Sequence, residues 1–301
     1  MKHGIPFGAN FDYEVRSPLH DQIFETEMNV MVVGTFWNGV MRPTSRAEFN
    51  FADTDGVVAW GRARNMDLQG QSLVWFEDIP DWVQAAPLAD VEAIMNEHID
   101  TVVRRYAGKI KAWNVVNESV ADDGGLRQNH RWAEAMGNDH IRKAFVRAHS
   151  ADPTAVLYYN DFDIESNQAK YEGVKALLIN LKNQGAPVHG LGWQMHVRPS
   201  SVVPATLLAR MNEIADLGFD NYVTELDVEL PEDAGATDYE QQKEIYKTLV
   251  QTFLVARRLK NIVVWGLRDG SPYWLTNNHP LLFDENLRKK PAYFGVEEAL
   301  R

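Results

Sequence analysis

Two glutamates at the ends of apolar segments are the residues of this 301-residue chain best suited to chemistry. Glu118 ends the run "AWNVVNE", and Glu225 lies in the run "VTELDV". A buried, unpaired carboxylate costs several kcal/mol or stays protonated, so each glutamate needs either a capping role or a function. Two carboxylates that face each other across a cleft can split a glycosidic bond. One donates a proton to the leaving oxygen, and the other attacks the anomeric carbon or activates water.

The separation of two such carboxylates decides the stereochemical outcome. A gap of about 5–5.5 Å gives a covalent intermediate and retention, whereas roughly 6.5–9.5 Å leaves room for a water molecule and gives inversion. The residues by themselves leave both outcomes open.

Polar neighbours of both glutamates fit this chemistry. Asn117 precedes Glu118 and could bond a sugar hydroxyl. His196 and Asp227 could form a hydrogen-bonded pair that orients Glu225, and Gln194 lies two positions before His196.

The elements that must position these residues form an alternating pattern. Between the β-rich segments lie stretches with helical spacing, such as residues 90–108, where Val91, Ile94, Ile99, Val102 and Val103 share one face. Eight such β-rich segments are found, at 5–9, 29–36, 67–76, 110–117, 154–160, 188–197, 221–228 and 261–267. This alternation predicts an α/β fold, a single (β/α)8 TIM barrel that forms one catalytic domain over residues 1–301. A doubly wound sheet is the competing fold, but the chain has no Gly-rich phosphate loop of the GxGxxG or GxxxxGK[ST] kind.

Polar residues gather at one end of the predicted strands. Several segments end in or carry them: Asn117, Glu118, Asn160, Asp161, Gln194, His196, Glu225, Asp227, Arg268 and Asp269. In a barrel these ends lie on the face where such enzymes keep their active sites.

Composition excludes several classes of partner. The net charge of −12 argues against a nucleic-acid partner, and no apolar stretch approaches the roughly 20 residues of a membrane span. The chain has no Cys, which excludes thiol nucleophiles and Cys-based metal sites. We expect a soluble monomer that binds a carbohydrate substrate. The first residues lack the long apolar segment of a secretory signal, and a secreted or a cytoplasmic location stays open.

A metal site is the alternative for the histidines. His189 and His196, with Glu225 and Asp227, could be ligands of a metal-dependent hydrolase. The two histidines are an odd number of positions apart, so on a regular strand they point to opposite faces. We therefore predict no metal and no cofactor.

The motifs together resemble glycoside hydrolase family 10, best known for endo-β-1,4-xylanases. "WNVVNE" is similar to the family's WDVVNE, "VTELDV" to its ITELDV, "GLGWQMH" to its Gln-x-His strand and "LYYNDFD" to its YNDYN. "VVWGLRD" and "PLLFDENLRKKPAY" resemble its last strand and tail, so the likeness runs from about Phe7 to Phe294. The resemblance implies retention of configuration, with Glu118 as acid/base and Glu225 as nucleophile.

The resemblance also implies a set of residues around the substrate. Asn117, Gln194, His196 and Asp227 would support catalysis. The implied substrate-binding residues are Asn38, Arg42, Gln71, Trp75, Asp78, Asn160, Phe162, Trp265 and Trp274.

Several positions of that set depart from the family. Thr35 and Asn38 stand where the family has Asn and Lys. Gln71 and Phe76 stand for two His, Asp78 for a Gln, Phe162 for a Tyr and Asp163 for an Asn, and the segment before Trp274 is one residue longer. Lost Lys and His side chains remove charge-assisted bonds to sugar hydroxyls.

These departures lead to expectations about the substrate. We expect Trp37 and Phe76 to add apolar surface. No polar residue of equal strength obviously replaces the lost side chains, though Arg42 lies close enough in sequence to swing in as a cation. The expected substrate is xylan-derived or a modified β-glycoside, with linear xylan a poor substrate. The alternative is a catalytically weak or inactive carbohydrate-binding barrel, which the retention of both glutamates opposes.

Overall fold

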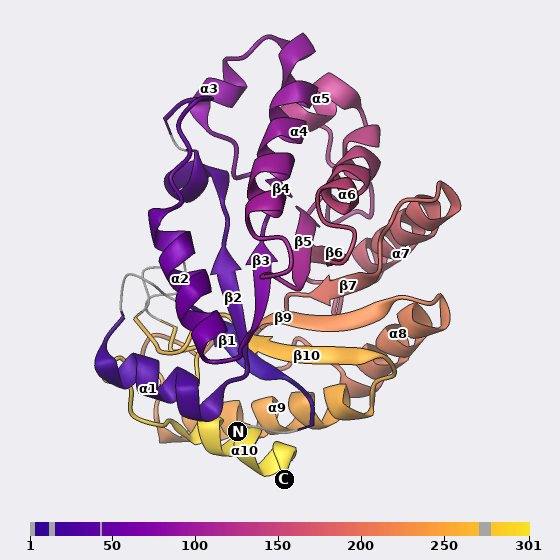
Figure 1. Cartoon of the computed structure of the whole chain (residues 1–301). Helices are drawn as coiled ribbons and strands as arrows, with labels where there is room; N and C mark the ends of the chain where they lie inside the picture. Colours follow the sequence, from indigo (N-terminus) through magenta and orange to yellow (C-terminus); the bar gives the residue numbers. More distant parts are fainter. Residues whose placement is uncertain (1–3, 12–15, 43, 271–277) are drawn as a thin grey trace. The chain divides into compact units, whose positions relative to one another are not determined.

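Strands and helices alternate along most of the chain in the computed structural model, which describes residues 4–11, 16–42, 44–270 and 278–301 (Figure 1). Trp274 lies outside the described residues. The chain divides into two compact units. The first unit consists of Met1–Val32, Arg64–Met66 and Trp193–Arg301, and the second of Val33–Ala63 and Asp67–Gly192.

The first unit contains a parallel array of strands in the order β2–β1–β10–β9–β8. Gly8 pairs with Val30 and with Val263, and His196 pairs with Asp227. Val30, Val32 and Val263 form a buried apolar cluster against which Trp265 packs. The strands are β1 (Phe7–Asn10), β2 (Val30–Gly34), β8 (His196–Val197), β9 (Asp220–Val228) and β10 (Leu259–Val264), and the helices are α1 (Pro18–Glu27), α8 (Pro204–Asp216), α9 (Ala236–Val255) and α10 (Pro291–Leu300).

The second unit repeats the pattern with the parallel order β3–β5–β6, and β4 lies beside β5. Its strands are β3 (Asp67–Gln71), β4 (Val74–Trp75), β5 (Ala112–Asn117), β6 (Val156–Asp161) and most of β7 (Gly190–Trp193). Its helices are α2 (Ala52–Ala63), α3 (Asp81–Gln84), α4 (Leu88–Arg105), α5 (Arg131–Met136), α6 (Asp139–Ala151) and α7 (Gln168–Asn183), with a π-helical turn η1 (Trp37–Met41).

The packing explains the sequence pattern in this unit. All six residues of β5 are buried, as expected of a strand covered on both faces. Gly70 of β3 has no side chain because the ring of Trp113 on β5 occupies that space, only 2.2 Å from where a Cβ would lie. In α4 the five residues predicted to share one face are all buried.

The prediction of fold class is confirmed: the chain has the (β/α)8 barrel fold. Each of the eight predicted β segments overlaps a strand of the structure. Two of the segments are divided, 67–76 into β3 and β4, and 188–197 into β7 and β8. The second division falls at Met195, whose φ of 66° lies in the left-handed region that a strand does not use.

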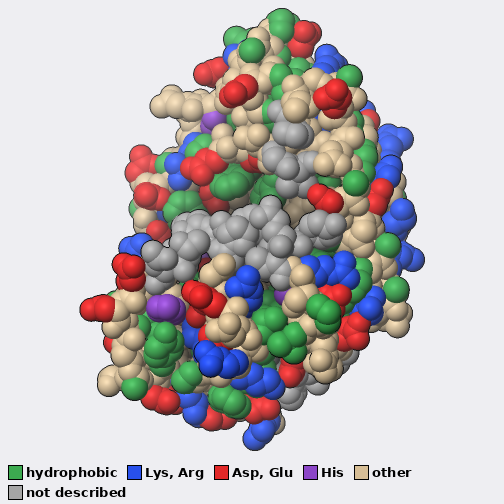
Figure 2. Space-filling model, turned by 90° about the vertical axis from the view of Figure 1, so that its left-hand side faces the viewer, with side chains coloured by type: hydrophobic (Ala, Val, Ile, Leu, Met, Phe, Trp, Pro, Cys, Tyr) green, Lys and Arg blue, Asp and Glu red, His purple; other side chains and the backbone are tan. Residues whose placement is uncertain are grey.

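The surface carries both signs of charge. On the face drawn in Figure 2, Lys and Arg side chains are scattered among Asp and Glu side chains. No helix within the described ranges is both long and apolar enough to cross a membrane.

Candidate active site

Glu118 follows directly after β5 and has a strained, left-handed backbone conformation that contacts with neighbouring residues must stabilise. Its φ is 58°, in the left-handed region that side-chain-bearing residues rarely adopt, and only 9% of its surface is exposed. The Trp75 indole N–H donates to Oε2 at 2.9 Å, and Nδ2 of Asn117 donates to Oε1 at 2.9 Å. The Glu118 carboxylate is therefore oriented on both oxygens.

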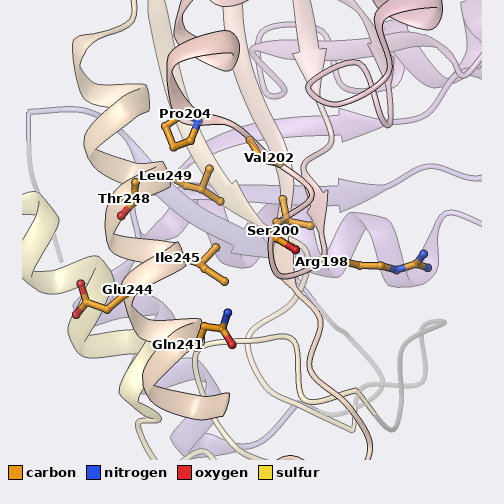
Figure 3. A pocket seen from close by; sticks show the side chains of 10 residues that line it. Arg198, Ser200, Val202, Pro204, Gln241, Glu244, Ile245, Thr248 and Leu249 are labelled. Atoms are coloured by element: carbon orange, nitrogen blue, oxygen red, sulfur yellow. The ribbon is translucent and has the colours of Figure 1, made fainter. Parts of the chain in front are cut away.

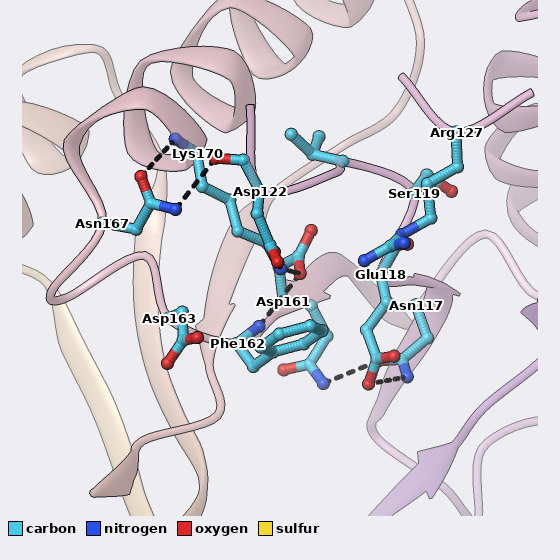
Figure 4. Close-up of polar contacts among 12 residues, drawn as sticks. Asn117, Glu118, Ser119, Asp122, Arg127, Asp161, Phe162, Asp163, Asn167 and Lys170 are labelled. Carbon is cyan, nitrogen blue, oxygen red and sulfur yellow. Dashed lines mark hydrogen bonds and ion pairs between the residues drawn. The ribbon is translucent and has the colours of Figure 1, made fainter. Parts of the chain in front are cut away.

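Asn117 is itself held in place by other amides. Its Oδ1 accepts from Nδ2 of Asn114 at 2.9 Å and from Nδ2 of Asn160 at 2.8 Å. Asn117 and Asn160 come from the paired strands β5 and β6, so the register of these strands fixes the donor that Asn117 offers to Glu118 (Figure 4).

Glu225 lies in the second half of β9, in the other unit. Oε2 of Glu225 is 3.4 Å from Nε2 of His196, whose Nδ1 lies 2.8 Å from Oδ2 of Asp227. The predicted hydrogen bond between Asp227 and His196 is present. Gln194 contributes its backbone, since its carbonyl accepts from the Glu225 N–H at 3.1 Å.

The charges of this group depend on one another. Burial alone lowers the pKa of His196, but the charge of Asp227 and hydrogen bonds to Asp227 and Glu225 outweigh it and hold that pKa well above its ordinary value. Burial raises the pKa of the Asp227 carboxyl, and His196 opposes that effect. The His196 imidazole thus lies between the carboxylates of Asp227 and Glu225, which favour its protonated form.

Four more predicted substrate-binding residues are described, Trp75, Phe162 and Gln71 in the second unit and Trp265 in the first. Trp75 and Trp265 are half-buried, and the Trp265 ring lies 6.5 Å from the His196 ring. Phe162 is half-buried beneath Nζ of Lys170, which is 3.1 Å from its ring centroid. Gln71 ends β3 and is buried, and its carbonyl accepts from the Thr35 N–H at 2.6 Å.

The carboxylate of Asp78, predicted to bind substrate, forms hydrogen bonds with the protein's own backbone. It accepts from the backbone N–H groups of Trp37 at 2.5 Å and Asn38 at 2.8 Å, at the start of η1. Burial raises the pKa of this carboxyl to about 7, although the two hydrogen bonds oppose the shift. Both oxygens hold the chain's own turn, so the prediction of a sugar contact finds no support in this arrangement. Asn38 itself is exposed.

Arg42 and Trp37 contradict two expectations. The Arg42 side chain has no exposed surface; it pairs with Glu97 at 3.0 Å and lies 4.2 Å from the Phe49 ring centroid. Trp37 is also fully buried and stacks on His98, with ring centroids 3.7 Å apart. The predictions that Arg42 replaces a sugar-binding cation and that Trp37 adds apolar surface are therefore wrong. Phe76 is half-buried, and the Arg127 guanidinium lies 4.7 Å from its ring centroid.

The sequence did not predict a role for four residues around Glu118. Arg127 donates from Nε to the Glu118 carbonyl at 3.0 Å. Tyr159, Asp161 and Lys170 form a buried network behind the same segment. In the sequence, Asp161 is noticeable only as a polar residue at the end of a predicted strand. Nothing in the sequence indicates that the side chain of Lys170, on a helix, is buried.

A separate pocket lies in the first unit (Figure 3). It has a volume of about 210 Å³ and is lined by residues from 197–204 and from α9, including Val202, Ile245 and Leu249. None of the predicted site residues lines it. Within the described ranges, no group of three or more His, Asp or Glu side chains is arranged to hold a metal ion.

Comparison with known proteins identifies relatives over the whole chain. The profile described as glycosyl hydrolase family 10 matches residues 1–299. Endo-1,4-beta-xylanase B of Thermotoga neapolitana is 30% identical over 305 residues, which cover 99% of this chain and 88% of that protein. The chain spans only about a quarter of the length of other relatives: 27% of Exoglucanase XynX of Acetivibrio thermocellus and 25% of endo-1,4-beta-xylanase A of Thermoanaerobacterium saccharolyticum, each 32% identical.

Solved structures show the same fold. Xylanase 10B from Thermotoga petrophila, in complex with xylobiose, superposes with a TM-score of 0.92 at 30% identity and covers 98% of this chain and 94% of that one. The intracellular xylanase TsXylA from Thermoanaerobacterium saccharolyticum, solved as a mutant with xylotriose, gives a TM-score of 0.89 at 32% identity, with 97% and 95% covered.

Proposed function

Because the chain belongs to glycosyl hydrolase family 10, we propose that it is a retaining β-glycoside hydrolase with Glu118 as acid/base and Glu225 as nucleophile. In the first step a Glu225 oxygen bonds to the anomeric carbon while the glycosidic C–O bond breaks and the leaving oxygen takes the proton of Glu118. In the second step Glu118 removes a proton from water, the water oxygen bonds to the anomeric carbon, and Glu225 leaves as a carboxylate.

The observation that supports these roles best is the contrast between the two carboxylates. Both are buried, with 9% of Glu118 and 3% of Glu225 exposed. Glu118 accepts from two neutral donors, the Trp75 indole and the Asn117 amide. Glu225 lies next to His196, whose raised pKa makes it a cation. A neighbouring positive charge suits a nucleophile that must be anionic, and neutral donors suit a group that gains and loses a proton.

His196 and Asp227 support the nucleophile in this proposal. Asp227 fixes the His196 ring through Nδ1 at 2.8 Å, which directs Nε2 toward Glu225 at 3.4 Å. Such an outer partner keeps a reactive group in one orientation.

The proposed substrate is xylan-derived or a modified β-glycoside with a carbohydrate chain. Relatives are named xylanases, and two similar structures contain xylobiose or xylotriose. Trp75, Trp265 and Phe162 offer half-buried aromatic surface for sugar rings, and Gln71 offers an amide. Asn160 has no exposed surface and acts through Asn117, whose Oδ1 accepts from its amide. Since Asp78 and Arg42 are engaged within the protein, we propose a reduced set of polar contacts on one side of the bond.

Variants of the two glutamates test the proposed roles. Glu118→Ala should lower kcat/KM by about 10²- to 10⁴-fold for aryl glycosides with poor leaving groups, because only those need protonation. Activated aryl glycosides should be cleaved in the first step almost as before, and added azide should restore turnover by attacking the glycosyl-enzyme. Glu225→Ala should abolish turnover of both kinds of substrate.

Controls make this test specific. Glu240→Ala, at an exposed position of α9, should leave all rates unchanged. A 2-fluoro glycoside should label Glu225 of the unaltered enzyme, as read by peptide mass spectrometry. Equal losses on both substrate types in Glu118→Ala, or a label on another residue, would contradict the assignment. Binding of xylo-oligosaccharides without any turnover would instead support a carbohydrate-binding barrel.

A further inference from the structure

The backbone after Glu118 is held by an unusual set of acceptors. Three consecutive N–H groups each have an acceptor from β6. The Glu118 N–H donates to the Asn160 carbonyl at 2.9 Å, and the next two, from Ser119 and Val120, both donate to the Tyr159 hydroxyl, at 2.8 and 3.1 Å. One side-chain oxygen therefore holds both of the amides that directly follow the left-handed residue Glu118.

The Tyr159 hydroxyl can accept twice because its own proton is engaged elsewhere. It donates to Oδ2 of Asp161 at 2.5 Å. A phenol has one proton and two lone pairs, so these three contacts use its whole capacity and fix its rotation. Burial and the charge of Asp161 raise the pKa of Tyr159 well above its ordinary value, which keeps the proton on the phenol.

Lys170 on α7 holds Asp161 in turn. Its Nζ lies 3.2 Å from Oδ1 of Asp161 and 3.3 Å from Oδ1 of Asp122, and the side chains of Lys170 and Asp161 have no exposed surface (Figure 4). Oδ1 of Asp161 also accepts from the Phe162 N–H at 3.0 Å. Burying an ion pair costs desolvation energy, whereas burying two apolar side chains does not. The buried pair of Lys170 and Asp161 therefore calls for a functional explanation.

We propose that Tyr159 is a positioning residue for Glu118, and that Asp161 and Lys170 hold its hydroxyl in the accepting orientation. Tyr159 does not touch the reacting atoms. It fixes the backbone of residues 119 and 120, and thereby the turn that aims the Glu118 carboxyl at the leaving oxygen. This inference rests on the proposed acid/base role of Glu118. It adds that residues of the neighbouring strand β6 and helix α7 determine the orientation of the Glu118 side chain.

Tyr159→Phe removes only the hydroxyl and tests the proposal. Aryl β-xylobiosides whose phenols range from activated to poor leaving groups are the probes. A small misplacement of a catalytic group can cost roughly 10²-fold, so kcat/KM on the poorest leaving groups should fall by about 10- to 100-fold. The loss should shrink steadily as the leaving group improves, KM should change little, and azide should accelerate turnover of the activated substrates.

Tyr158→Phe is the matched control. Tyr158 is the preceding residue of β6, is equally buried and points to the opposite face of the strand. It should show at most a uniform change across the series of leaving groups. Thermal unfolding of both variants separates lost stability from lost positioning.

Asp161→Asn is the second variant, and it keeps an acceptor for the Tyr159 hydroxyl without the charge. It should show a smaller loss with the same dependence on the leaving group. If neither Tyr159→Phe nor Asp161→Asn shows that dependence while Glu118→Ala does, the positioning role is overturned and the acid/base role stands. If Glu118→Ala lacks the dependence as well, the proposed function fails first.

Discussion

Asp78 is a residue whose ionisation should be visible in the stability of the protein. The ordinary pKa of its carboxyl is 3.8, and burial raises it to about 7 in the folded state. The folded protein therefore keeps the proton over a range of pH in which the unfolded chain has released it. The stability that this group contributes is fully present below pH 4 and is lost as the pH rises toward 7.

The prediction is a difference between two pH profiles of unfolding. The free energy of unfolding of the unaltered protein, minus that of Asp78→Asn, should fall by about 2–4 kcal/mol between pH 4 and 7, since each unit of pKa shift corresponds to about 1.4 kcal/mol. Urea unfolding at half-unit steps of pH measures it. Asp53→Asn, at an exposed position in the first turn of α2, should show no such change. Parallel profiles for Asp78→Asn and the unaltered protein would refute the prediction.

The same residue shows what sequence could and could not predict about the site. The hydrogen bond between His196 and Asp227 was predictable from position alone, because polar residues in otherwise apolar strands must have partners. Arg42 was misassigned, and the partners of Asp78 were not foreseen, because a residue's type does not reveal the direction of its side chain. Asp78 turns toward amides 41 and 40 positions away in the chain, and Arg42 toward Glu97, 55 positions away.

At the scale of elements, α7 and the turn after Glu118 approach too closely for any side chain between them. A Cβ on Gly173 of α7 would lie 2.2 Å from the carbonyl oxygen of Gly124, and that turn is joined to the Glu118 segment by the bridge between Val120 and Leu126. This contact holds the helix that carries Lys170 against the loop that carries Glu118.

Gly173→Ala should therefore be destabilising although it replaces glycine in a helix. Overpacking of this kind costs about 1–3 kcal/mol, and the backbone oxygen it meets has little room to move. Gly56→Ala is the matched control, because Gly56 lies inside α2, is exposed and has no atom within 4 Å of a new Cβ. It should stabilise the protein by about 0.5–1 kcal/mol. Thermal or urea unfolding measures the change in the free energy of unfolding for both variants. If Gly173→Ala stabilised the protein as Gly56→Ala should, the proposed contact would be contradicted.

Elements were predictable to the extent that they depend on local pattern. The buried face of α4 and the apolar run of β5 are visible in the sequence because period and hydrophobicity are local properties. The turn η1 was not predicted, since its first two amides depend on the distant Asp78. The division of segment 188–197 depends on the left-handed backbone at Met195, which its residue type does not indicate.

For the whole molecule, the net charge of −12 gives a prediction about substrates. A negative enzyme repels an anionic oligosaccharide, and salt screens that repulsion. The specificity constant kcat/KM for glucuronate-bearing xylo-oligosaccharides should rise by about twofold to tenfold between low and physiological ionic strength. Neutral arabinose-bearing and linear xylo-oligosaccharides should show little change, and they serve as the control.

The same panel tests the reduced polar contacts of the proposed substrate site. If these contacts are lost, linear xylan should have a lower kcat/KM than at least one decorated oligosaccharide or aryl β-glycoside. Loss of two charge-assisted hydrogen bonds, each about 1.5–3 kcal/mol, would weaken binding by at least tenfold. A value for linear xylan equal to or above all others would show that Gln71 and Trp75 form an adequate sugar site without them.

The hydrogen bond from the Trp75 indole to Glu118 gives the protein a built-in spectroscopic reporter. The chemical shift of an indole proton responds strongly to the charge of the oxygen that accepts it. The Trp75 resonance in a ¹H–¹⁵N spectrum, assigned by its loss in Trp75→Phe, should therefore move as Glu118 changes its protonation state. Titrating it in the free protein and again in the glycosyl-enzyme trapped with a fluorosugar would follow the proton of the proposed acid/base directly, without any turnover of substrate.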